Sequence, residues 1–262
     1  MTLPRGLHVA AIGTLALLVL PIVGLVSRVR WETLGQDLLS EAALTALGLS
    51  LSTAACATLV CVVLGVPLAA VIARASPRVA GALRAVVLVP LVLPPMVGGL
   101  ALLSLLGRSG LIGRPLFEAT GFSLPYTTTA VVVAQSFVAL PFLVITIEGA
   151  LRTSGTGYEQ VAASLGAGRW RVLTRVTLPL VLPGLVAGTV LCFARAVGEF
   201  GATALFAGNS AGVTRTMPLA IYTAFNGVGV SQDSAVALSL LLLVSATVIV
   251  AGLRSWREDA VR

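Results

Sequence analysis

The stretch Leu47–Ala73 reads LGLSLSTAACATLVCVVLGVPLAAVIA and contains no charged side chain over its 27 residues. A helix of about 20 apolar residues is long enough to cross the hydrocarbon core of a bilayer. A transmembrane barrel is excluded, because its strands are short and alternate apolar with polar residues. The stretch therefore predicts a membrane-spanning helix.

The rest of the chain has the same character. Of its 262 residues, 57% are hydrophobic and only 10% are charged, and the mean hydropathy is +1.03. An average soluble domain has about 25% charged residues, so a soluble globule is excluded, and so is a disordered chain. We therefore predict an all-α, polytopic membrane protein with six transmembrane helices. The five spans besides Leu47–Ala73 are expected at Leu7–Val26, Leu83–Leu106, Thr128–Leu151, Leu182–Phe206 and Val236–Leu253.

The distribution of arginine predicts the orientation in the membrane. All 17 basic residues are arginine, and the net charge is +7. Cytoplasmic segments of membrane proteins carry an excess of basic residues. If the N-terminus is inside, 11 arginines fall on the inner side and 5 on the outer side, with Arg195 inside a span. We expect a multi-pass protein of the cell membrane with both termini cytoplasmic, and we attribute the positive charge to inner loops rather than to nucleic-acid binding.

The residue types that are missing exclude several chemistries. A Walker A loop needs lysine, and the chain has none, so any ATP must be bound by another chain. The single histidine, His8, and three cysteines inside apolar runs do not make a metal site. The segment Gly208–Gly212 fits GxSxG, but it lacks the strand-turn-helix context and the nearby histidine of a hydrolase. We expect no catalytic residue, metal or cofactor in this chain, and no enzymatic activity.

A loop predicted to be cytoplasmic, residues 152–183, carries an amphipathic pattern. Glu159 falls in the first turn of a short helix, where the helix dipole favours an anion, and Gly166 suits a helix end. A second helical run, Gly168–Val176, is expected to end before Leu178. Such a segment can lie on lipid headgroups or dock a soluble partner. One helical face carries the spacing i, i+3, i+4, i+7 at Tyr158, Val161, Ala162 and Leu165.

This loop resembles the EAA loop of ABC-importer permeases, whose pattern is EAA, three residues, Gly, nine residues and then I-x-L-P. Here Gly166 is followed by nine residues and then by Val176–Pro179, VTLP. The sequence departs from the pattern at Gln160, which holds the Glu position with Glu159 before it, and at Val161, which holds the first Ala position. The resemblance implies that a separate ATPase subunit, the user of ATP-Mg, contacts Glu159, Gln160, Val161, Ala162, Leu165 and Gly166.

A second segment narrows the resemblance. Phe193–Thr203, FARAVGEFGAT, is similar to the FARxxGEFG motif of molybdate, tungstate and sulfate permeases. The pair Gly208–Asn209 and the stretch Gly212–Tyr222, GVTRTMPLAIY, look like the corresponding segment of the molybdate and tungstate branch. Ala211 replaces the usual Pro of that segment, and Met217 replaces a Leu.

The resemblance covers about residues 40–255 and implies a type I ABC importer permease fold that moves molybdate or tungstate. It implies four partners: an ABC ATPase subunit, an external substrate-binding protein, a second copy of the chain and the oxyanion substrate. The predicted organisation is an N-terminal helix with an external loop (1–40), the permease core with coupling loop 152–183 (41–255) and a cytoplasmic tail (256–262). A sulfate or thiosulfate permease and a self-standing channel or secondary transporter remain as alternatives.

Two further groups of polar residues are candidates for the transport path. Arg195 and Glu199 lie four residues apart in a predicted span, where charges face the protein interior and pair. They can form a structural ion pair, or Arg195 can give positive potential to an oxyanion path. Asn209, Thr214 and Arg215 lie in the predicted external loop 207–235, either as solvated residues or at the path mouth and the contact with the binding protein.

Overall fold

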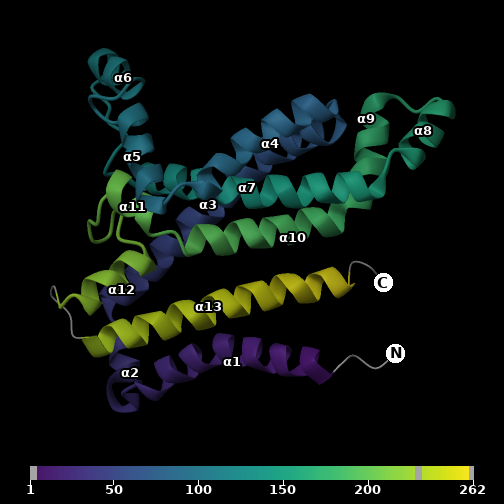
Figure 1. Cartoon of the computed structure of the whole chain (residues 1–262). Helices are drawn as coiled ribbons and strands as arrows, with labels where there is room; N and C mark the ends of the chain where they lie inside the picture. The colour runs from purple at the N-terminus through teal and green to yellow at the C-terminus, as the bar shows by residue number, and fades with distance from the viewer. Residues whose placement is uncertain (1–4, 228–231, 260–262) are drawn as a thin grey trace.

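The computed structural model describes residues 5–227 and 232–259, and within them every regular element is a helix (Figure 1). The predicted all-α class is therefore confirmed. In chain order the elements are α1 (Arg5–Ser27), α2 (Trp31–Leu38), α3 (Glu41–Arg74), α4 (Pro77–Val92), α5 (Pro95–Leu106), α6 (Gly113–Thr120), α7 (Thr128–Ser154), α8 (Gly157–Ser164), α9 (Arg169–Val172), the π turn η1 (Leu173–Thr177), α10 (Leu178–Val197), α11 (Gly201–Phe206), α12 (Met217–Phe225) and α13 (Gln232–Asp259).

Several of these helices can cross a membrane. Within the described residues, α1, α3, α7 and the continuous helix Arg169–Val197 have the length and hydropathy of a span, and the bent pair α4 and α5 can form a fifth. A shorter apolar stretch, Asp233–Ile249, lies in α13. The multi-pass architecture is thus as predicted, while a count of six spans depends on this shorter stretch.

The predicted span Leu83–Leu106 is not one straight helix, because the chain bends by 110° between α4 and α5. Leu93 has the extended backbone angles φ −67° and ψ 133°. Two prolines follow it, and a proline disfavours helical geometry in the residue before it and lacks the N–H of the helical ladder. Pro94 and Pro95 therefore end α4 and restart the chain as α5.

The predicted span Leu182–Phe206 is also wrong at both ends. Its helix ends at Val197, and α11 follows as a separate short helix. At the other end the helix extends back to Arg169, so the second helical run does not stop before Leu178. The π turn η1 ends at Thr177, two residues before Pro179, and such single-turn bulges occur inside α-helices. Much of the loop predicted at 152–183 is therefore helical.

Helix α7 lies at the centre of the bundle, with α3 and α10 packed against it (Figure 1). Small residues allow the close approach. A Cβ atom added to Gly184 would lie 2.4 Å from the Ala150 Cβ, and one added to Gly188 would lie 3.3 Å from the Thr146 Cβ. The GxxxG spacing of these two glycines, a pattern that permits close helix contacts, thus serves packing within one subunit.

The segments outside the bundle differ from simple loops. The predicted external loop 207–235 contains α12, which packs against α13 and α3. The loop within 1–40 contains α2, and α13 runs to Asp259, into the predicted tail 256–262, whose last residues lie outside the described part. None of the apolar window of α1 is buried, so α1 presents its apolar surface to its surroundings.

Candidate functional site

Helix α8 ends in a defined turn. The Gly166 N–H donates to the Ala163 carbonyl and the Ala167 N–H to the Ala162 carbonyl, each at 3.0 Å. Together with the positive φ of Gly166, 83°, these two bonds make a Schellman motif. The helix stop predicted at Gly166 is therefore confirmed.

The outer surface around α8 is apolar. Val161 and Leu165 are 60% and 83% exposed, while Tyr158 and Trp170 are 68% and 78% exposed. Exposed apolar side chains gathered outside a membrane-spanning region mark an interaction surface. We call Tyr158, Val161, Leu165 and Trp170 the exposed apolar patch. Of the predicted face, Ala162 is only half-exposed and lies beside the patch.

Sequence reasoning missed Trp170 as a member of the patch. It lies at the start of α9, on the other side of the turn that follows α8. The signal was a single large aromatic residue between Arg169 and Arg171. That signal is weak, because it depends on how α9 turns back towards α8.

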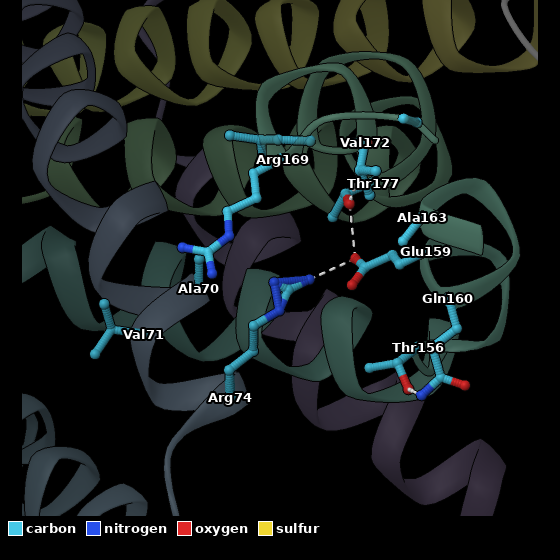
Figure 2. Close-up of a pocket in the computed structure, with 12 residues that line it drawn as sticks. Ala70, Val71, Arg74, Thr156, Glu159, Gln160, Ala163, Arg169, Val172 and Thr177 are labelled. Carbon is cyan, nitrogen blue, oxygen red and sulfur yellow. Dashed lines mark hydrogen bonds and ion pairs between the residues drawn. The ribbon is translucent and has the colours of Figure 1, made fainter. Parts of the chain in front are cut away.

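Glu159 points away from the patch and connects α8 to the transmembrane bundle. Its carboxylate forms an ion pair with the guanidinium of Arg74, at the end of α3, and accepts a hydrogen bond from Thr177 Oγ1 at 2.6 Å (Figure 2). Thr177 is buried, and the Glu159 side chain is only 18% exposed. We call these three residues the Glu159 cluster. It ties α8 to two membrane-spanning helices.

Gln160, also predicted to contact the ATPase, is exposed, and its side chain contacts the residue that precedes α8. Its Nε2 donates to Thr156 Oγ1 at 3.3 Å, within the first turn of α8. The six residues predicted to contact an ATPase therefore divide into three groups. Val161 and Leu165 face outward, Glu159 faces the bundle, and the others shape or flank the helix.

The predicted pair of Arg195 and Glu199 is present. The Arg195 Nη2 lies 2.7 Å from Glu199 Oε2, and the two side chains are 26% and 1% exposed. Glu199, however, lies beyond the end of α10 rather than on it, and its Oε1 accepts from the Ala202 N–H at 2.8 Å. A carboxylate at a helix N-terminus is stabilising, so this pair joins α10 to α11 across the break.

The predicted external group is only partly exposed. Arg215 donates from Nε to Asn209 Oδ1 at 2.9 Å, and Asn209 Nδ2 donates to Thr223 Oγ1 of α12 at 2.9 Å. Thr214 is fully buried, and its Oγ1 accepts from the Ser210 N–H at 2.9 Å. Thr214 therefore shapes the turn, while Asn209 and Arg215 form its outer polar surface.

The structure adds an ion cluster that sequence reasoning missed. Glu148 of α7 is almost buried and accepts from Arg84 Nε of α4 at 2.7 Å and from Arg152 Nε at 2.8 Å. The i, i+4 spacing of Glu148 and Arg152 was a usable signal. The cluster fixes α4 against α7 near the start of the coupling loop.

Sequence comparisons identify relatives of this chain. Residues 65–261 match the family model for binding-protein-dependent transport system inner membrane components. The molybdenum transport system permease protein ModB of Mycobacterium tuberculosis is 53% identical over 250 residues, which are 95% of this chain and 93% of that protein. ModB of Escherichia coli is 43% identical over 175 residues, 67% of this chain and 76% of that protein. These relatives confirm the resemblance to the molybdate branch of the ABC-importer permeases.

Solved structures share the fold at low identity. A bacterial alginate ABC transporter, in complex with an alginate pentasaccharide-bound periplasmic protein, has a chain with a TM-score of 0.74 and 20% identity, covering 94% of this chain and 90% of its own. A chain of the MetNI methionine ABC transporter has a TM-score of 0.65 and 19% identity, and the match covers 86% of this chain and 100% of that chain. The predicted type I importer permease fold is thus confirmed, and the chain belongs to the family of binding-protein-dependent transport system inner membrane components.

Proposed function

We propose that this chain is the membrane permease subunit of an ABC importer that moves molybdate, or tungstate, into the cell. The observation that carries the proposal is the 53% identity to ModB of Mycobacterium tuberculosis over 95% of this chain. Two copies of the chain form the path, an external binding protein delivers the oxyanion, and a separate ATPase subunit binds ATP-Mg. The chain itself is not an enzyme. Its lack of lysine supports this division, because a Walker A loop requires one.

The geometry around α8 supports a proposal for the chain's own part in this cycle. The exposed apolar patch docks on the ATPase subunit, with Gly166 and Ala162 shaping the contact. Movement of the ATPase reaches the bundle through the Glu159 cluster, which bonds α8 to the end of α3 and to the start of the helix Arg169–Val197. Arg195, 26% exposed and beside the α10–α11 break, is the candidate for positive potential along the path.

Uptake by the reconstituted complex tests the proposal. Proteoliposomes that contain the permease, its ATPase and its binding protein should take up molybdate only with ATP inside. Excess unlabelled tungstate should compete, and excess sulfate should not. Equal competition by sulfate would favour a sulfate or thiosulfate permease, and uptake without the ATPase subunit would favour a channel or secondary transporter.

We expect Glu159→Gln to uncouple transport while it preserves docking of the ATPase. The amide keeps the shape and one acceptor for Thr177, but it loses the charge that holds Arg74. A hydrogen bond to a charged group contributes about 1.5–3 kcal/mol, and about tenfold lower uptake per ATP hydrolysed is the expected result. Uptake and ATP hydrolysis are measured on the same proteoliposomes. Glu118→Gln, in the exposed Arg114 pair, is the control, and equal coupling ratios in the two variants would contradict the role of Glu159.

The orientation is tested with single cysteines in a background without the native ones. Ser164 at the end of α8 and Ser210 in the loop before α12 are both exposed. Because 11 arginines fall on the predicted inner side and 5 on the outer, and basic residues favour the inner side, a membrane-impermeant maleimide added to cells should label Ser210→Cys only. Ser164→Cys should react after the cells are opened. Labelling of Ser164→Cys in intact cells would contradict the predicted orientation and indicate the opposite one.

The outer polar surface is expected to contact the binding protein. Arg215→Glu reverses a charge and removes the donor to Asn209, so it should lower the stimulation of ATPase activity by the binding protein, mainly through slower association. The expected decrease is about fivefold at low salt and smaller at high salt, where screening weakens the field. Titration of the binding protein at two salt concentrations measures it. Unchanged stimulation would leave Asn209, Thr214 and Arg215 as solvated or structural loop residues.

A further inference from the structure

A cavity of about 770 Å³ lies behind α8, on the side opposite the exposed apolar patch. It is an open cavity lined by α8, the last turns of α3 and the helix that begins at α9 (Figure 2). One part of its lining is polar and contains Arg74, Arg169, Gln160 and Thr156. Another part is apolar and includes Val71, Val172 and Leu173.

The charges in this cavity are unbalanced. Arg74 and Arg169 come from different helices and both line the cavity; the Arg74 guanidinium is directed at the Glu159 carboxylate, and Arg169 is exposed (Figure 2). The only carboxylate among its lining residues is that of Glu159, which pairs with Arg74. Within the part of the chain that the structure describes, the Arg169 side chain makes no hydrogen bond or ion pair, whereas that of Arg74 pairs with Glu159. Two arginines and one carboxylate leave one net positive charge.

Two guanidinium groups that line one cavity repel each other, and an anion bound between them would offset that repulsion. The planar fork of arginine matches the oxygens of phosphate and similar tetrahedral anions. Thr156 and Gln160 supply further polar groups on the same wall. The arrangement favours an oxyanion over a simple halide, because several donors can each bond a different oxygen.

The position of the cavity adds a second argument. It lies where two helices long enough to span a membrane, α3 and Arg169–Val197, reach their ends, and the ends of spanning helices lie near the lipid headgroups. Basic pockets between spanning helices at this level bind anionic headgroups. The apolar wall of Val71, Val172 and Leu173 provides a surface for the adjoining acyl chain.

We propose that this cavity binds a phosphate-type oxyanion between Arg74 and Arg169, supplied by an anionic lipid headgroup or by a free anion. The bound oxyanion connects α3 to α9 beside the Glu159 cluster, so its occupancy stiffens the attachment of α8 to the bundle. The inference does not depend on which oxyanion is transported.

Binding to the full-length permease tests the proposal with two probes. The first is radiolabelled inorganic phosphate, measured by equilibrium dialysis in detergent. The second is phosphatidylglycerol, counted by native mass spectrometry after extraction from nanodiscs, with phosphatidylcholine nanodiscs for comparison. Arg169→Gln removes the unpaired guanidinium and leaves the Glu159 cluster intact. Arg171→Gln is the matched control, since Arg171 is exposed on the same short helix and does not line the cavity.

We expect Arg169→Gln to bind a probe about tenfold more weakly, because it loses one charge-assisted contact. Arg171→Gln should bind like the wild type. If only phosphatidylglycerol behaves in this way, the source is a lipid, and if only inorganic phosphate does, it is a free anion. Equal binding by the two variants would overturn the proposal in favour of a diffuse positive surface. Unchanged binding of both probes, with weaker recovery of the ATPase subunit in Arg169→Gln, would overturn it in favour of a contact with an acidic residue of that subunit.

Discussion

Glu199→Leu is expected to destabilise the permease by about 3 kcal/mol, because it leaves Arg195 inside the bundle without its carboxylate. Glu199 is 1% exposed, and it also accepts the Ala202 N–H at the start of α11. Arg195 is 26% exposed, which places the expected loss at the low end of the range for buried pairs. The measurement is thermal unfolding of the detergent-solubilised protein, followed by tryptophan fluorescence.

A double variant separates the structural role of the pair from a role in transport. Arg195→Met with Glu199→Leu removes both charges, and replacing a buried ion pair by apolar residues is often close to neutral. We expect it to recover most of the stability. Glu118→Leu is the matched control, because Glu118 forms an i, i+4 pair with Arg114 that is 60–70% exposed, worth at most about 0.5 kcal/mol. Equal losses in Glu199→Leu and Glu118→Leu would contradict the prediction, whereas a stable double variant that fails in uptake would place the pair in the oxyanion path.

The helical membrane architecture could be predicted because the length of an apolar run is a local property of the sequence. The run Leu47–Ala73 lies wholly inside α3, and Thr128–Leu151 lies wholly inside α7. The break at Pro94 and Pro95 was also encoded locally, since two adjacent prolines cannot continue a helix. Hydropathy alone does not detect such a break, because the valine and leucine residues on both sides keep the average high.

The end of α10 at Val197 could not be predicted in this way. It depends on the contact between α5 and α11, which are far apart in the sequence. A Cβ atom on Gly201 would lie 2.7 Å from the Pro95 Cβ, and one on Gly99 would lie 2.8 Å from the Ala202 carbonyl oxygen. The backbones of α5 and α11 therefore lie in direct contact. That contact stabilises the interruption between α10 and α11.

In the candidate site, too, local features could be predicted from the sequence, and long-range contacts could not. The spacing of apolar residues over the nine residues Tyr158–Gly166 predicts a short helix with an apolar face that ends at Gly166. It does not predict the partners of Glu159, because Arg74 lies 85 residues away and Thr177 lies 18 residues away. The sequence places Glu159 in a first helical turn, where it suits the dipole, and only the packed structure shows that it faces the bundle rather than a partner subunit.

Leu165→Glu should abolish both the recovery of the ATPase subunit and ATP-driven uptake. Leu165 is the most exposed member of the patch, at 83%, so nothing in the permease itself depends on its side chain. In the docked complex it becomes a buried apolar anchor, and a carboxylate there would be desolvated without a partner. Interface anchors of this kind are worth on the order of 2 kcal/mol or more, which is about 30-fold in affinity.

Two controls make this prediction specific. Leu165→Met keeps an apolar side chain of similar volume and should retain both docking and uptake. Leu39→Glu places the same charge on another exposed leucine, 74% exposed and between α2 and α3, and should leave recovery of the ATPase unchanged. All three proteins should be made in equal amounts and unfold at the same temperature, because position 165 is outside the packed core. Recovery of the ATPase by Leu165→Glu at the level of Leu39→Glu would exclude the exposed apolar patch as the docking surface, and with it the role assigned to α8.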